Sequence, residues 1–317
     1  MSKYGGVSTV TIAEGVEMPL FGLGTWQSAP NAVRTATAHA LKNGYRLIDT
    51  AAIYGNEAEV GNGIKDAGLN RDEFFVTTKL WNSHHHPDDV ADALDASLEK
   101  LGLDYVDLYL MHYPVCQDRA EFEKGNSIVR DISYKETWKE MEKLLATGKT
   151  KAIGISNFAK CELDDLLSEC TIKPAVHQME MHPYLKQQDF LDYHKSKGIH
   201  VTAYSAFGNQ NPSYKLADEP RISEHPTVVE IAKKTGHTPS QLLVAWALKR
   251  GVSVIPKSVT PSRIEENLVG TNIELSDEDF KAISDLGHSV RYCDYGDVVG
   301  YQFFKDLECP GKMPLVA

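Results

Sequence analysis

Six segments of the chain repeat one local pattern, in which a stretch carrying Lys or Arg leads to glycine and then to a β-branched apolar run. They are LKNGYRLIDT, KDAGLNRDEFFVTTKLW, EKLGLDYVDLYLMH, LATGKTKAIGISNF, KSKGIHVTAYS and LKRGVSVIPKS. A cation in the last turn of a helix complements the helix dipole, and glycine just beyond it can adopt the left-handed C-cap conformation. Each join therefore predicts the end of a helix and the start of a strand.

The predicted strands are apolar nearly throughout, as expected for parallel strands covered on both faces. The runs PLFGLG near residue 20 and PAVHQMEMH near residue 177 bring their number to eight. Eight parallel strands alternating with helices predict an α/β fold, a (β/α)8 TIM barrel, with an open doubly wound sheet as the rival. Gly22 and Gly24 supply only part of a GxGxxG dinucleotide motif, because Trp26 and Gln27 follow them, and this favours the barrel.

The remaining segments are predicted to surround this barrel. Apolar residues at 90, 94, 98 and 101, and at 138, 141 and 145, have helical spacing. STVTIAEGVEMPL resembles an N-terminal β-hairpin that turns at Glu14-Gly15 and caps the bottom of the barrel. Long βα loops at 113–133 and 208–226, and the segment 288–317, are expected over the C-terminal mouth. With no linker in the chain, residues 1–317 are predicted to form a single domain.

Composition narrows the classes of partner. A net charge of -11 argues against nucleic-acid binding, and the absence of a long apolar run or a secretory signal predicts a cytoplasmic protein without membrane contact. Five scattered cysteines argue against a disulfide framework. Adjacent His84, His85 and His86 cannot all face one ion, so no metal is expected, and His182 is expected to pack in the interior.

Four polar residues lie where predicted strands end, and the ends of barrel strands converge around one axis. Asp49 ends the second strand, Tyr54 follows on its loop, Lys79 ends VTTKLW and His112 ends VDLYLMH. Each alone has an ordinary structural explanation: a helix cap, a surface tyrosine, a solvated lysine and a core histidine. Together they predict a catalytic group.

This group makes chemical sense as a proton-transfer unit. A tyrosine ordinarily has a pKa of about 10, and an adjacent ammonium that stabilises the phenolate brings it closer to a working range. Lys79 can be that ammonium, Asp49 can hold it charged, and His112 can donate to a carbonyl oxygen. Such a group polarises a carbonyl and protonates the resulting alkoxide, but it needs a separate hydride donor.

The later strand ends suit a nicotinamide cofactor. Ser156, Asn157 and Gln178 can bind a carboxamide, and Tyr204, followed by Ser205, offers a face to a flat ring. A phosphate site commonly follows strands seven and eight of a barrel, and here a helix predicted to start at Pro261 has basic and hydroxyl neighbours. Those neighbours are Lys257, Ser258, Thr260 and Arg263, of which Lys257 and Arg263 suit the 2′-phosphate of NADP.

At these residues the sequence resembles the aldo-keto reductase family, and within it the fungal aldehyde reductases of the glycerol-dehydrogenase type. The motifs that carry the resemblance are GLGTW, Asp49 with YGNE, KLW, DYVDLY, His112, GISNF and KSVT, so that it extends over essentially the whole chain. The resemblance implies that Asp49, Tyr54, Lys79 and His112 are catalytic. It also implies that NADPH/NADP+ is bound by Thr25, Ser156, Asn157, Gln178, Tyr204, Ser205, Lys257, Ser258, Val259, Thr260, Arg263, Glu266 and Asn267.

The expected substrate pocket is mainly aromatic and is formed by Trp26, Ile53, Trp81, Tyr113 and Tyr214. Many relatives have tryptophan directly after the histidine where this chain has Tyr113, which adds a hydroxyl and trims the apolar wall. The pocket therefore suits aldehydes of moderate size, while Tyr113 could also help to bind a polyol chain.

The leading hypothesis is an NADPH-dependent reductase of sugar or aromatic aldehydes and some ketones, with Tyr54 as general acid, acting as a monomer or weak dimer on a small carbonyl substrate. One alternative is an NADPH-binding regulatory or structural protein without physiological turnover. Another is a different barrel enzyme, such as a phosphosugar isomerase, which would leave Gln178 and Tyr204 without a role.

Overall fold

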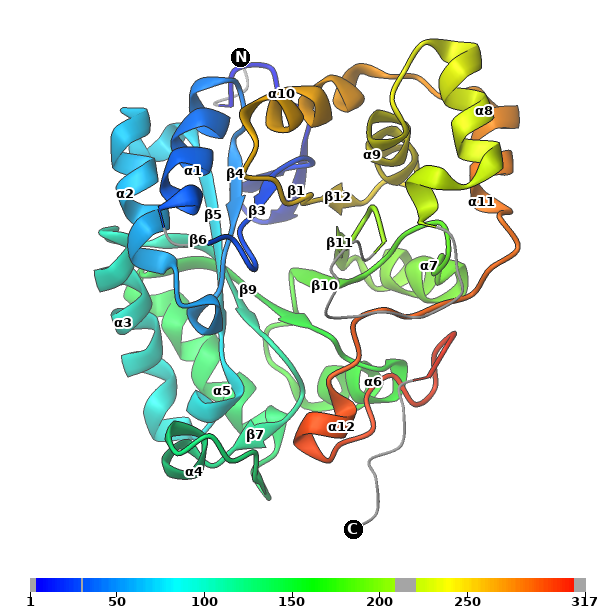
Figure 1. Cartoon of the computed structure of the whole chain (residues 1–317). Coiled ribbons are helices and arrows are strands. Elements are labelled where there is room, and N and C mark those ends of the chain that lie inside the picture. Colours follow the sequence, from blue (N-terminus) through cyan, green and yellow to red (C-terminus); the bar gives the residue numbers. More distant parts are fainter. Residues whose placement is uncertain (1–3, 30, 209–220, 311–317) are drawn as a thin grey trace.

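A computed structural model describes residues 4–29, 31–208 and 221–310, and within these ranges eight parallel strands form one sheet (Figure 1). The strands follow the chain order around the sheet, and each pairs in parallel with its neighbours. They are β3 (Leu23–Gly24), β4 (Leu47–Asp49), β5 (Phe75–Leu80), β6 (Val106–Met111), β9 (Thr150–Ser156), β10 (Val176–Glu180), β11 (His200–Tyr204) and β12 (Ser253–Val254).

The first and last strands meet and close the sheet into a barrel. Parallel bridges join Phe21 to Val254 and Gly24 to Lys257. At Gly24 the two backbones approach so closely that an added Cβ would lie 2.7 Å from the carbonyl oxygen of Ile255. The predicted (β/α)8 barrel is confirmed, and glycine is needed at this point of closure.

Helices cover the outer face of the strands (Figure 1). The main ones are α1 (Ala32–Lys42), α2 (Glu57–Ala67), α3 (Val90–Leu101), α5 (Tyr134–Leu144), α6 (Lys160–Glu169), α7 (Gln188–Lys197), α8 (Pro226–Thr235), α9 (Pro239–Lys249), α10 (Pro261–Val269) and α11 (Asp277–Ser284). Capping boxes start two of them: Ser133 with Glu136 at α5, and Thr238 with Gln241 at α9. None of the helices described is both long and apolar enough to cross a membrane.

The local pattern in the sequence predicted where these helices stop. The glycine that follows the basic stretch in each of the six repeated segments has a positive φ angle, which glycine adopts at little cost: Gly44 (104°), Gly68 (73°), Gly102 (65°), Gly148 (73°), Gly198 (65°) and Gly251 (78°). The apolar face predicted at 138, 141 and 145 also includes Leu144, the buried last residue of α5, and Leu145 begins a 3₁₀ turn and packs half-buried against the core.

The predicted N-terminal hairpin is also present and consists of β1 (Thr9–Ala13) and β2 (Val16–Pro19). Val16 and Met18 of the hairpin, with Tyr4, pack against inward side chains of the barrel strands such as Leu47 and Phe75. Both barrel residues are the first of their strands, so the hairpin closes the amino-terminal end of the barrel and leaves the carboxyl end for the site.

Two excursions add structure near the carboxyl end. The segment after β6 contains β7 (Cys116–Gln117), α4 (Arg119–Glu123) and β8 (Val129–Arg130), with β7 and β8 antiparallel. The C-terminal segment contains the short helix α12 (Gly296–Val299). Its Asp306 accepts hydrogen bonds from the first backbone N–H groups of α6, at Lys160 and Cys161, which fixes this segment to the barrel.

Candidate active site

Lys79 is the centre of a buried polar group at the carboxyl end of the barrel. It projects from β5, and its Nζ lies 2.6 Å from Asp49 Oδ1, 2.9 Å from the carbonyl oxygen of Thr50 and 3.2 Å from Tyr54 Oη. The ammonium group has three donors, and these three acceptors use all of them. Asp49 ends β4 and Tyr54 ends the 3₁₀ turn Ala52–Tyr54 just beyond it, so one turn places both beside the neighbouring strand.

Burial dominates the electrostatics of this pair. The side chain of Lys79 is fully buried and that of Asp49 is 4% exposed. Desolvation lowers the pKa of Lys79, and the attraction and hydrogen bond of Asp49 oppose that effect. The second carboxylate oxygen, Asp49 Oδ2, accepts from Gln178 Nε2 at 2.7 Å. Asp49 is therefore held at both oxygens, which fixes the lysine that faces Tyr54.

His112 completes the predicted group. It follows β6, and its ring centroid lies 5.8 Å from that of Tyr54 in an edge-to-face arrangement. Burial, and next the positive charge of Lys79, hold the pKa of His112 well below its usual range, so the imidazole is neutral near pH 7. A neutral imidazole carries one N–H and can donate one hydrogen bond to a carbonyl oxygen. All four predicted residues thus converge.

The predicted nicotinamide residues form a second cluster beside the first. Tyr204 Oη donates to Asn157 Oδ1 at 2.6 Å, and Asn157 Nδ2 donates to the backbone oxygen of His112 at 2.9 Å and to Ser156 Oγ at 3.1 Å. Asn157 and Ser205 adopt positive φ angles of 62° and 50°, which are uncommon for non-glycine residues. The hydrogen bond from Asn157 ties this cluster to the backbone of His112. Thr25 lies nearby, with its hydroxyl donating to the carbonyl oxygen of Asp49 at 3.0 Å.

The predicted phosphate residues lie around the start of α10, which begins at Pro261 as expected. Lys257 and Arg263 are exposed, and no carboxylate among the described residues forms an ion pair with either. Ser258 Oγ accepts from the backbone N–H of Thr260 at 3.1 Å. Two unpaired cations at a helix N-terminus suit an anionic group.

Three other residues predicted to bind the cofactor, Glu266, Asn267 and Val259, are less exposed than Lys257 and Arg263. Glu266 is half-buried, and its Oε1 accepts from the Thr238 hydroxyl at 2.7 Å, which ties it to the start of α9. Asn267 is buried, and Val259 packs against the core with a half-buried side chain.

Aromatic rings form a wall beside His112. The ring of Trp81 lies 5.1 Å from His112 and 6.1 Å from Tyr113. Ile53 is 37% exposed and Trp26 is half-buried, whereas Tyr214 lies outside the described residues.

Three further rings of this wall were not predicted from the sequence. Tyr295 lies 5.8 Å from Trp81 and 5.7 Å from Tyr113, Phe122 lies 6.1 Å from Trp81, and Phe303 lies 5.0 Å from Tyr113. They come from the segment after β6 and from the C-terminal segment. In the sequence, the only indication that these rings could reach the substrate pocket was the presence of aromatic residues in loops expected over the C-terminal mouth of the barrel.

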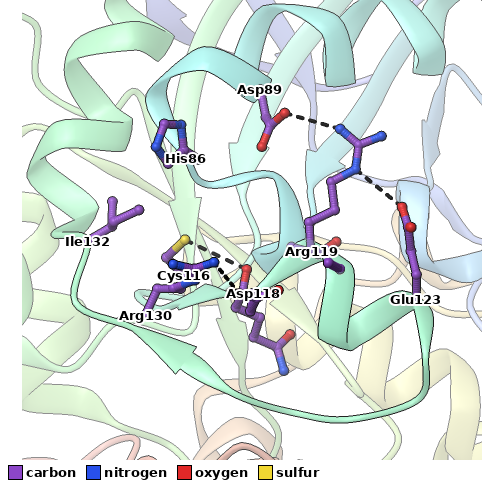
Figure 2. Close-up of a pocket in the computed structure, with 11 residues that line it drawn as sticks. His86, Asp89, Cys116, Asp118, Arg119, Glu123, Arg130 and Ile132 are labelled. Atoms are coloured by element: carbon purple, nitrogen blue, oxygen red, sulfur yellow. Dashed lines mark hydrogen bonds and ion pairs between the residues drawn. The ribbon is translucent and has the colours of Figure 1, made fainter.

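A hollow of about 380 Å³ lies outside this wall, between β7, α4 and β8 (Figure 2). Figure 2 shows Arg119 at its edge, where it bridges Asp89 and Glu123 at 3.1 and 3.3 Å. Neither Tyr54, Lys79, Asp49 nor His112 lines the hollow, so it is separate from the candidate site.

The histidine run at 84–86 does not form a metal site. Among the described residues there is no group of three or more potential His, Cys, Asp or Glu ligands. His85 is fully buried, and desolvation lowers its pKa to about 3. The expectation that His182 packs in the interior is confirmed, because its side chain is fully buried.

The (β/α)8 barrel brings a tyrosine, a lysine, an aspartate and a histidine together at the carboxyl end of its strands, where active sites of barrel enzymes lie. More specifically, the chain belongs to the aldo/keto reductase family, whose model matches residues 20–288. It is therefore an oxidoreductase of a family whose members generally use a nicotinamide cofactor.

Individual relatives agree with this assignment. The chain is 48% identical to an uncharacterized oxidoreductase of Schizosaccharomyces pombe and 47% identical to aldo-keto reductase family 1 member A1 of Xenopus tropicalis, in each case over 89% of both chains. It is 45% identical to the human protein of the latter name, over 90% of this chain and 91% of the relative. A solved aldose reductase from Schistosoma japonicum matches with a TM-score of 0.86 and 36% identity, over 94% of this chain and 98% of that one.

Proposed function

We propose that the protein is an NADPH-dependent reductase that converts aldehydes, and some ketones, to alcohols, with Tyr54 as the general acid. The observation that carries this proposal is the position of Lys79 Nζ, which lies 2.6 Å from Asp49 and 3.2 Å from Tyr54. In this arrangement an ammonium, held by a carboxylate, faces the oxygen of a tyrosine. That geometry suits the donation of a proton and the stabilisation of the phenolate that remains.

The roles of the side chains follow from their contacts. His112, as a neutral imidazole, donates a hydrogen bond to the carbonyl oxygen and orients it. Tyr54 then gives its proton to the oxygen as negative charge develops there, and Lys79 stabilises the tyrosine oxygen. The aromatic wall of Trp81, Tyr113 and Tyr295 excludes water and binds the apolar part of the substrate.

The described residues also fit the cofactor. Bound NADPH would supply the hydride, which none of these side chains can provide. The ring of Tyr204, anchored through Asn157, is available for a flat heteroaromatic ring, and the exposed cations Lys257 and Arg263 suit the 2′-phosphate.

The direct test is to follow the absorbance of NADPH while the protein is mixed with glyceraldehyde, short sugars or aromatic aldehydes. We expect consumption of NADPH that depends on both the aldehyde and the protein. Tight binding of NADPH without turnover of any carbonyl compound would instead support a regulatory role for the cofactor site.

A separate prediction concerns the preference of the protein for NADPH over NADH. Arg263→Ala is expected to weaken NADPH binding by about 10-fold or more, because it removes a charge-assisted contact to the 2′-phosphate worth about 1.5–3 kcal/mol. NADH binding should change little, since NADH lacks that phosphate. Titration of intrinsic fluorescence with each cofactor measures both affinities, and equal losses for the two would contradict the assignment.

A further inference from the structure

Glu180 is a buried carboxylate whose hydrogen bonds all lead away from the proton-transfer group. It is the last residue of β10, and its side chain is fully buried. Oε1 accepts from the backbone N–H of Tyr292 and from His182 Nε2, both at 2.8 Å, and Oε2 accepts from the backbone N–H of Cys293 at 2.8 Å. Burial alone would raise the pKa of Glu180, but the hydrogen bond from His182 and the charge of Arg291 hold it below its usual range.

Two successive backbone N–H groups of the C-terminal segment thus converge on one carboxylate of the barrel. This is a connection between distant parts of the chain, because Glu180 and Cys293 are 113 residues apart in sequence. Hydrogen bonds to an ionised acceptor are stronger and geometrically stricter than those between neutral groups. The contact therefore fixes both the position and the direction of the backbone at residues 292 and 293.

The segment held in this way leads directly into the substrate wall. Tyr295 follows Cys293 by two residues, and its ring lies 5.8 Å from Trp81 and 5.7 Å from Tyr113. On the other side, Cys293 Sγ lies 3.5 Å from the Ser205 hydroxyl, next to Tyr204. The glutamate thus anchors a segment that contacts the aromatic wall through Tyr295 and Ser205 through Cys293.

We propose that Glu180 is a positioning residue that places Tyr295 and thereby sets the affinity of the enzyme for aldehydes large enough to reach that ring. The inference rests on the proposed reductase function. It predicts a dependence on substrate size, because a two-ring aldehyde contacts the outer wall whereas a short aliphatic aldehyde needs only the group around His112.

The test compares Glu180→Gln with the parent, using NADPH and either propanal or 2-naphthaldehyde. The glutamine keeps the shape but loses the charge and turns a donor toward one of the two N–H groups. We expect KM for 2-naphthaldehyde to rise about 10-fold, which is the effect of about 1.4 kcal/mol. KM for propanal, kcat for both aldehydes and the affinity for NADPH should stay within about twofold of the parent values, which is well below the roughly 10-fold rise expected for 2-naphthaldehyde.

A matched control is Asp107→Asn, which also removes the charge of a buried carboxylate. Asp107 binds Arg71 at 2.7 Å and the backbone N–H of Val76 at 2.9 Å, near the amino-terminal ends of the strands. It should lower stability without any change that depends on substrate size. An equal rise of KM for both aldehydes in Glu180→Gln would overturn the inference.

The Tyr295→Ala variant keeps the proposal testable if Glu180→Gln does not fold. Alone, it should raise KM for 2-naphthaldehyde and not for propanal, and an unchanged KM for the larger aldehyde would overturn the inference. In the double variant, Glu180→Gln should add nothing to the effect of Tyr295→Ala, and multiplied effects would contradict positioning through that ring. A parent that reduces neither aldehyde would overturn the proposed function and this inference with it, whereas an active parent with no size-dependent effect overturns the inference alone.

Discussion

Replacement of Tyr54 by phenylalanine is expected to lower kcat for aldehyde reduction by about 10²–10⁴-fold, the range typical of a lost general acid. The physical reason is the contact between Lys79 Nζ and Tyr54 Oη at 3.2 Å. The ammonium stabilises the oxygen that gives up its proton, and phenylalanine has no proton to give. Steady-state consumption of NADPH with a saturating aldehyde measures the loss.

The fold and the cofactor site should survive this change. Tyr54 is half-buried, its replacement removes a single oxygen, and the other two acceptors of Lys79, Asp49 and the backbone of Thr50, remain. NADPH affinity, measured by fluorescence titration, should therefore match that of the parent.

Tyr134→Phe is the appropriate control, because it deletes a tyrosine hydroxyl on α5 that donates to Asp165 outside the site. Its kcat should equal that of the parent. Full turnover by Tyr54→Phe would show that another group supplies the proton.

The architecture could be predicted because its determinants are local in sequence. Each repeated glycine ends a helical or turn segment on its own, and an apolar run that follows within a few residues starts a strand. Once eight strands alternate with helices, barrel closure places every strand end around one axis. Asp49, Lys79 and His112 could therefore be brought together without any knowledge of their contacts.

The contacts that could not be predicted join segments distant in sequence whose pairing leaves no periodic signal. Gln178 was expected only at the cofactor, yet its amide also donates to Asp49, which is 129 residues away. Glu180 was not identified as functional, because a single glutamate at the end of a strand carries no information about which backbone N–H groups it will bind. Tyr295 was missed for the same reason, since only tertiary packing brings α12 and its neighbours to Trp81.

The pairing of Lys79 with Asp49 makes the second strong prediction, which concerns stability. Both side chains are almost completely buried, at 0% and 4% exposure. Lys79→Met would leave the carboxylate of Asp49 buried without its cation, and removal of one partner from a buried ion pair typically costs about 3–5 kcal/mol. The free energy of unfolding, measured by urea titration, should fall by an amount in this range, and aldehyde turnover should also be lost.

The double variant Asp49→Asn/Lys79→Met separates the two effects. Replacement of both partners by neutral residues of similar size removes the unpaired charge, so the double variant should be more stable than Lys79→Met alone. It should nevertheless remain inactive, because no ammonium faces Tyr54. If Lys79→Met were as stable as the double variant, the buried carboxylate of Asp49 would not need the lysine ammonium for its stabilisation. The hydrogen bond from Gln178 at 2.7 Å would then have to stabilise its negative charge alone. Recovery of stability without recovery of turnover would instead assign the ion pair to catalysis, since neutral residues could then replace it in the folded protein but not in the reaction.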